Sequence, residues 1–125
     1  MFFEYHQNNS GGSFEVTPER GIAPLVIIEA SDAVDANERA EGIGLYFNGC
    51  DLGMDCECCG DRWYEAWIGT EQPEVYGRVI ADGKVAEPKK PYAFSNMKWA
   101  DGPEGYIHYK DGRIEPFDYE AVSPA

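Results

Sequence analysis

The strongest hydrophobic pattern of the chain lies in one strand and in the helix that follows it. Leu25–Glu29 (LVIIE) is β-branched and continuously apolar, which is typical of a strand buried on both faces of a sheet. Beyond it, Ala33, Ala36, Ala40 and Ile43 recur at helical spacing, with charged residues between them. This spacing predicts a helix whose small alanine face lies close to a sheet.

The predicted helix has signals at both ends. Ser31 or Asp32 supplies an N-cap, and Gly42 and Gly44 favour a stop. The next apolar residues, Leu45–Phe47, are predicted as a short strand. Together with the strand before the helix they would form a β-α-β unit with a right-handed crossover.

Shorter alternating or aromatic stretches predict the rest of the sheet. Phe2–Gln7 and Ser13–Val16 are expected to form a hairpin around Asn8–Gly12. The clearest hairpin joins Gly105–Tyr109 to Arg113–Phe117 through a Lys-Asp-Gly turn. The other predictions are a strand or aromatic anchor at Arg62–Ile68, a strand at Glu74–Ala81, a turn at Asp82-Gly83 and a linker-like loop at Glu87–Pro91.

These elements define the expected fold class. One segment has a sustained helical period and at least five have strand composition, so we expect an α+β fold. Its mostly antiparallel sheet carries one main helix, at about residues 32–42, on one face, and residues 48–61 form a Cys-rich loop. At 125 residues and 43% hydrophobic content, the chain fits a single globular domain spanning residues 1–125.

The net charge of the chain indicates which classes of molecule it is not expected to bind directly. Ten Lys and Arg residues face 23 Asp and Glu residues, which gives a formal net charge of −13. Such a surface repels nucleic-acid phosphates and anionic membranes, so direct binding to either is not expected. The acidic residues are scattered, which favours a self-repelling, soluble surface over a nucleic-acid mimic that competes for a basic partner.

The start of the chain shows no export signal. It has no basic n-region, and its longest apolar run, from Ile22 to Ile28, contains Pro24. That run is far shorter than the ~20 apolar residues that cross a bilayer. The sequence therefore predicts a cytoplasmic protein, in which cysteines are reduced or bind metal.

Four cysteines are the most chemically specific feature of the chain. Cys56 and Cys59 have the Cys-x2-Cys spacing that lets two thiolates bind one ion from a tight turn, which is half of a zinc knuckle. Cys50 and Cys58 are the first choices for the remaining ligands of a structural Zn²⁺, with His6 or His108 as substitutes. The alternative is a set of reduced cysteines packed as small hydrophobes.

A second candidate site combines a cation, an indole and a polar loop. Arg62 beside Trp63 has the groups to clamp a phosphate and stack on a planar ligand, and Asn9 and Ser10 lie in a loop rich in hydrogen-bonding groups. A nucleotide-like molecule is the ligand class that such groups would suit. Each feature also has a structural interpretation: the arginine bonds an aspartate or loop carbonyls, the indole fills the core, and the loop is a hairpin turn.

Catalytic signatures are weak. The two histidines, His6 and His108, lie in predicted strands among aromatic residues, and no local nucleophile motif surrounds any cysteine. Three thiols within four residues are more typical of ligands than of one activated nucleophile. The sequence therefore favours a protein that is not an enzyme.

Three motifs carry a resemblance. They are NNSGGSF at residues 8–14, VIIEA followed by ANERAEGIGLYFNGC up to Cys50, and DCECCGDRWY at residues 55–64. In these motifs the chain resembles a group of small proteins encoded by tailed bacteriophages. The resemblance implies synthesis in the cytoplasm of an infected bacterium and implies no mechanism.

This setting shapes the expected function. Small accessory phage proteins often inhibit host enzymes or immune systems by binding a protein or sequestering a signalling nucleotide. We therefore expect a non-enzymatic accessory protein that binds and inhibits a host factor, such as a bacterial defence component. The alternatives are a structural component of the virion and, with less support, a small metal-dependent enzyme.

Overall fold

The sheet is built around the apolar strand predicted at its centre. In the computed structural model, which describes residues 1–8, 15–55, 57, 60–87 and 103–121, strand β2 is Leu25–Glu29 and its first four residues are buried. It pairs antiparallel with β1 (Phe2–His6) on one side and parallel with β7 (Gly105–His108) on the other. The prediction of a central strand buried on both faces is confirmed.

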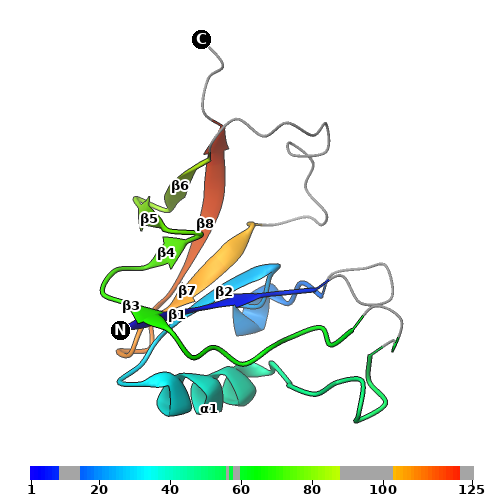
Figure 1. Cartoon of the computed structure of the whole chain (residues 1–125). Helices are drawn as coiled ribbons and strands as arrows, with labels where there is room; N and C mark the ends of the chain where they lie inside the picture. The colour runs from blue at the N-terminus through cyan, green and yellow to red at the C-terminus, as the bar shows by residue number, and fades with distance from the viewer. Residues whose placement is uncertain (9–14, 56, 58–59, 88–102, 122–125) are drawn as a thin grey trace.

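In the described part of the chain the sheet has eight strands in the order β3-β1-β2-β7-β8-β6-β5-β4 (Figure 1). Five of the strand pairs are antiparallel and two are parallel, so the expected α+β class with a mostly antiparallel sheet is confirmed. The remaining strands are β3 (Gly69–Thr70), β4 (Glu74–Val75), β5 (Arg78–Ala81), β6 (Lys84–Glu87) and β8 (Ile114–Ala121), and a short 3-10 helix covers Pro18–Arg20.

Helix α1 (Ala33–Ile43) packs against one face of the sheet, as predicted. Asp32 caps it by accepting a hydrogen bond from the Asp35 amide at 2.8 Å, and Gly44 ends it at a φ of 119°, which glycine adopts without strain. Ala36 and Ala40 are fully buried against the aromatic and aliphatic residues of β1 and β2. None of the helices among the described residues has the length and apolar character that a membrane crossing requires.

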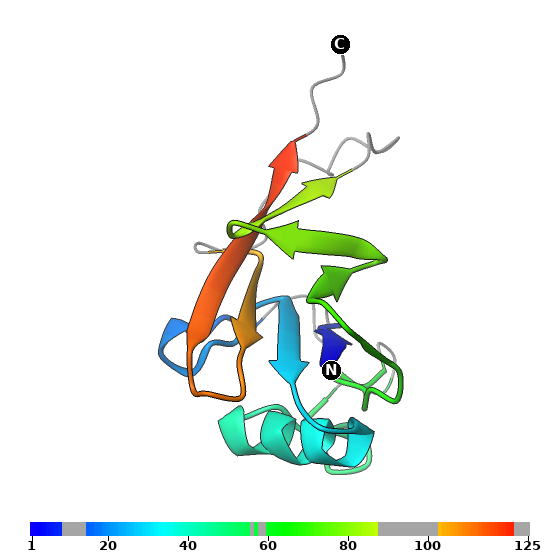
Figure 2. The ribbon, with the colours of Figure 1, turned by 90° about the vertical axis from the view of Figure 1, so that its left-hand side faces the viewer.

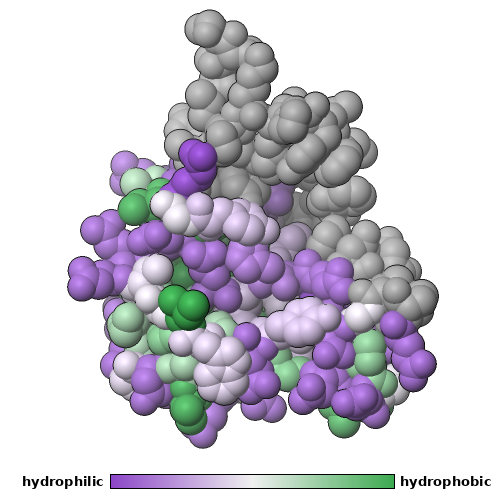
Figure 3. Space-filling view, viewed as in Figure 1, coloured by the Kyte–Doolittle hydropathy of each residue, from purple (hydrophilic) through white to green (hydrophobic). Residues whose placement is uncertain are grey.

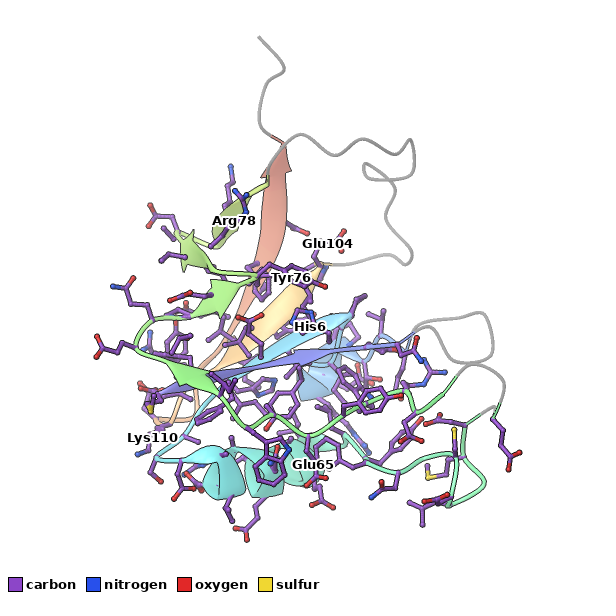
Figure 4. All side chains as sticks on the ribbon, viewed as in Figure 1. His6, Glu65, Tyr76, Arg78, Glu104 and Lys110 are labelled. Carbon is purple, nitrogen blue, oxygen red and sulfur yellow. The ribbon has the colours of Figure 1, made fainter. Side chains whose placement is uncertain are left out.

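The opposite face of the sheet is covered by strands rather than by a helix. Leu25 and Ile27 of β2 form a second core cluster with Val75 and Ile80, which come from β4 and β5. Figure 2 shows α1 and β4–β5 on opposite sides of β1 and β2. At the edge of the β4–β5 hairpin, the rings of His6 and Tyr76 are in contact at an interplanar angle of 37°, with centroids 4.5 Å apart, and both residues are labelled in Figure 4.

Two local predictions at the start of the chain are wrong. Glu15 and Val16 are not in a strand: β1 pairs along its length with β2, β3 pairs with its first two residues, and the Glu15 main chain bonds the side chain of Gln7 instead. Leu45–Phe47 is not a strand either, since β2 is flanked by β1 and β7 and offers no free edge. The expected first hairpin and the β-α-β unit are therefore absent from the described residues.

Two further strand predictions are wrong, because the structure has a turn or an irregular segment at those positions. The stretch predicted as one strand at Glu74–Ala81 is a hairpin, because Tyr76 and Gly77 have positive φ values of 51° and 78° and reverse the chain between β4 and β5. Arg62–Ile68 is not a strand, although Trp63 is the aromatic anchor that was the other possibility. The turn at Asp82-Gly83 and the β7–β8 hairpin are confirmed, while residues 88–91 of the linker-like loop lie outside the described residues.

Candidate protein-binding surface

Two aspartates hold the two ends of the Cys-rich segment together. The Asp55 carboxylate, whose side chain is almost completely buried, accepts hydrogen bonds from the Tyr46 hydroxyl at 2.9 Å and the Arg62 amide at 2.8 Å. Asp61 accepts from the Cys50 amide at 2.9 Å. Because both carboxylates bond main-chain groups across the loop, they fix the chain on either side of residues 56–59, of which the structure describes only Glu57.

The Arg62 side chain bonds other residues of the same chain. Its Nη1 donates to Oε1 of Gln7 at 2.6 Å, and its Nε lies 3.9 Å from the Asp55 carboxylate. Gln7 in turn donates to the carbonyls of Glu15 and Ala23. The guanidinium therefore ties the end of β1 to the Cys-rich segment, which is the structural alternative considered for this residue.

Trp63 also has a structural position. It is 1% exposed and packs in the core cluster with Phe3 and Tyr5 of β1, so its indole faces the protein interior. The other two predicted ligand-binding residues, Asn9 and Ser10, lie outside the described residues. Their neighbour Asn8 donates a hydrogen bond from its main-chain amide to the Arg62 main-chain carbonyl at 2.7 Å. This bond places Asn8, at the start of that loop, beside Arg62.

Of the four predicted metal ligands, the structure describes Cys50, whereas Cys56, Cys58 and Cys59 lie outside it. Burial, and then the hydrogen bond and charge of Asp61, raise the pKa of the Cys50 thiol to about 11. A cysteine binds zinc as the thiolate, so a bound zinc ion would have to displace the proton from the Cys50 thiol. Within the described residues no three His, Cys, Asp or Glu side chains form a group able to hold a metal ion.

The two histidines named as substitute ligands have partners elsewhere. His6 Nε2 lies 2.9 Å from the Glu4 carboxylate, and His108 Nε2 donates to the Gly21 carbonyl at 2.7 Å. Burial lowers the pKa of His108, and the bond to the Gly21 carbonyl opposes this shift only in part.

The residues after Trp63 form an apolar surface that sequence reasoning did not single out. Trp67 and Ile68 are 64% and 85% exposed, and Tyr64 is also exposed. Figure 3 shows pale and green side chains gathered over β3 and the segment that leads into it, surrounded by purple. We call Trp67, Ile68 and Val34, an exposed residue in the first turn of α1, the Trp67 surface.

Asn37 fixes the main chain behind this surface. Its amide donates to the Ala66 carbonyl and accepts from the Ala66 amide, both at 3.0 Å, so it pairs with Ala66 as a neighbouring strand would. The same Asn37 oxygen accepts from the Tyr5 hydroxyl at 2.7 Å. Burial, reinforced by the charge of Glu65, raises the pKa of Tyr5, so this hydroxyl keeps the proton that it donates.

A sequence signal for the exposed surface does exist. Trp63 and Ala66 are buried, and between and after them the chain places Tyr64, Trp67 and Ile68. In an extended segment at most one of two successive side chains enters the core through a given face, so at least one of Trp67 and Ile68 is expected to be exposed. Adjacent large apolar residues outside a two-sided strand were the available clue.

The fold and the surface define an α+β protein in which one helix and an extended segment present a small apolar surface beside one edge of a mostly antiparallel sheet. The family model of a domain of unknown function (DUF7296) matches residues 1–124, and the chain belongs to this family. No curated protein and no solved structure matches it significantly.

Proposed function

We propose that this chain is a non-enzymatic binding protein that blocks a partner protein by covering part of its surface. The observation that carries the proposal is the exposure of Trp67 and Ile68 in a chain of formal net charge −13. A few residues, among which tryptophan is enriched, supply most of the binding energy in protein interfaces. The position of Trp67 and Ile68 on an ordered segment of an acidic protein supports recognition of another protein.

The partner that we propose is a host factor in the cytoplasm of a phage-infected bacterium, such as a defence component. The support for this setting is the resemblance of three sequence motifs to small proteins of tailed phages. The acidic surface supports a partner with basic residues, including a partner whose basic groove normally holds nucleic acid. In that case binding weakens steeply with added salt.

Protein binding is better supported than capture of a nucleotide-like signal. A phosphate site needs an available cation, and the Arg62 guanidinium already bonds Gln7 and lies beside Asp55. A planar base needs an open ring, and Trp63 is buried.

We also propose that Cys50, Cys56, Cys58 and Cys59 hold a structural zinc ion. The support is the Cys-x2-Cys spacing and the position of Cys50 at the start of a segment that Asp55 and Asp61 close. The ion would hold the Cys-rich segment in one conformation, beside the contacts of Arg62 with Gln7 and Asp55.

Co-purification from infected bacteria tests the proposed function. The tagged chain is isolated, and the bound proteins and small molecules are identified by mass spectrometry, with an unrelated tagged acidic protein as the control. A host protein recovered in stoichiometric amount supports the proposal. A bound nucleotide without a protein partner, incorporation of the chain into mature virions, or no specific partner would each contradict it.

A further inference from the structure

The Trp67 surface has the chemistry to select one kind of partner. We infer that it inserts into an apolar cleft whose rim carries lysine and arginine side chains, on a protein other than a second copy of this chain. This inference rests on the proposed function and names the surface and the partner chemistry through which that function would operate.

The first support is the local excess of apolar area. Trp67 and Ile68 are adjacent and mostly exposed, and Figures 1 and 2 both place the first turn of α1, which contains Val34, beside the segment leading into β3. Scattered exposed hydrophobic residues are normal on protein surfaces, whereas contiguous ones mark interaction sites.

The second support is the rigidity of the segment. Asn37 is buried and holds Ala66 by two hydrogen bonds, and Gly69, one residue beyond Ile68, lies so close to the Phe3 ring that a Cβ there would come within 2.8 Å of it. Trp67 and Ile68 lie between these two fixed points. A surface ordered before binding loses little conformational entropy when the partner arrives.

The third support is the charge around the surface. Residues 63–73 contain two glutamates, Glu65 and Glu71, and no lysine or arginine. Glu65 lies on the segment that passes between β1 and α1 in Figure 4. On the helix, Glu41 is exposed one turn after Asn37, and the nearby Arg39 is paired with Asp35 at 3.1 Å.

This charge distribution decides between the two classes of occupant. A second copy of the chain would bring two glutamate-rich rims together, and like charges across an interface oppose association. A partner with lysine and arginine around an apolar cleft would instead meet Trp67 with apolar contacts and the glutamates with opposite charge. The surface therefore fits a heterologous, basic-rimmed partner.

Site-specific photo-crosslinking in infected bacteria tests the surface directly. A benzoylphenylalanine is placed at Trp67 in one chain and at Val79 in a matched control, because Val79 is also an exposed apolar residue but lies on β5. We expect a discrete adduct with a host protein from position 67 and none from position 79. Equal crosslinking from both positions, or adducts containing two copies of this chain, would overturn the inference.

Substitutions then measure the contribution of each part. With the crosslinked protein purified, Trp67→Ala is expected to weaken binding at least tenfold, and the double change Glu65→Lys with Glu71→Lys to weaken it in a salt-dependent way. Glu19→Lys, at an exposed position of the 3-10 helix, is the charge control and should change binding little. Unchanged affinity for Trp67→Ala with a confirmed partner would overturn the inference and leave the proposed function standing, whereas recovery of no partner overturns both.

Discussion

At the scale of single residues, Asn37 is a buried polar group on which the position of the Trp67 surface depends. It lies on the face of α1 that packs on the sheet, and its amide serves both Ala66 main-chain groups and the Tyr5 hydroxyl. A buried amide that satisfies three partners fixes their relative positions, because each partner would otherwise be buried without a hydrogen bond. Asn37 therefore positions the Trp67 surface without belonging to it.

Replacing this residue should show that role. Asn37→Ala leaves the Ala66 amide and carbonyl and the Tyr5 hydroxyl without partners, so we expect a loss of about 2–4 kcal/mol in the free energy of unfolding. Chemical denaturation measures this loss, and hydrogen exchange should show faster exchange of the Ala66 amide. Glu38→Ala, at an exposed neighbouring position, is the control. Unchanged exchange at Ala66 would contradict the role of Asn37.

His108 makes folding stability depend on pH. Its pKa is lowered, mainly by burial, so the folded state favours the neutral ring. Such a group contributes its full stability above its unfolded pKa of about 6.5 and loses it as pH falls below that value.

The comparison of wild type with His108→Gln isolates this effect, because glutamine can still donate to the Gly21 carbonyl but does not titrate. We expect wild type to lose more stability than the variant between about pH 7.5 and about pH 5. Urea denaturation at both pH values measures the difference. Parallel losses in the two proteins would show that His108 does not contribute.

At the scale of elements, the sequence predicted those features that depend on local signals. The β7–β8 hairpin follows from two alternating runs around a Lys-Asp-Gly turn, and α1 follows from its alanine spacing and its capping residues. The failed predictions at Glu15–Val16 and Leu45–Phe47 concern strand neighbours, whereas the turn at Tyr76 and Gly77 is a local feature that the strand pattern concealed. Leu25 pairs with Gly105, eighty positions later in the chain. No local sequence pattern shows that both edges of β2 are occupied by distant strands.

The candidate site also combines features that local sequence patterns predict with features that depend on distant contacts. The Cys-x2-Cys spacing and the Arg-Trp pair are local and were visible in the sequence. Whether an aromatic residue enters the core is decided by distant partners: Trp63 packs against β1, whereas Trp67 faces outward because Asn37 binds Ala66 from the helix. The apolar surface could therefore be recognised only once α1 and this segment were placed together.

The β4–β5 hairpin should stabilise the sheet through its inward-facing residues, Val75 and Ile80. Ile80 is 7% exposed in the second core cluster, whereas the adjacent Val79 is 47% exposed. We expect Ile80→Ala to lower the free energy of unfolding by about 2–5 kcal/mol, and Val79→Ala to change it by about 0.5 kcal/mol or less. Thermal or urea unfolding of the two variants checks this contrast. Equal effects would mean that the hairpin does not cover the sheet as the structure shows.

The Cys-rich segment gives a prediction about metal. If the four cysteines hold zinc, protein purified without chelator should contain about one zinc per chain, because four thiolates complete one tetrahedral site. A strong chelator or Cys56→Ser should then lower the melting temperature, and adding zinc back should restore the chelated wild type but not the variant. Elemental analysis decides the matter: zinc far below one per chain would leave reduced, packed thiols as the explanation.

At the scale of the whole molecule, the dominant property is net charge. Opposite charges do meet in the described structure, as in the pairs of Arg39 with Asp35 and of Arg113 with Asp111, yet carboxylates outnumber cations by more than two to one in the chain. Repulsion among the unpaired carboxylates opposes the compact state and is screened by salt. The same carboxylates attract a basic partner, and salt screens that attraction as well. Folding stability and partner binding should therefore respond to salt in opposite directions.

This opposition gives the last prediction. As ionic strength rises from about 0.01 M to about 0.15 M, the Debye length falls from about 30 Å to about 8 Å, so we expect the melting temperature to rise and the affinity for the partner to fall. The double change Glu38→Gln with Glu41→Gln, at two exposed positions of α1, brings the formal net charge from −13 to −11 and should reduce the salt dependence of stability. Calorimetric melts of both proteins across the salt series measure it. A melting temperature that falls with salt would mean that attractive ion pairs, such as those of Arg39 and Arg113, outweigh the repulsion among the carboxylates.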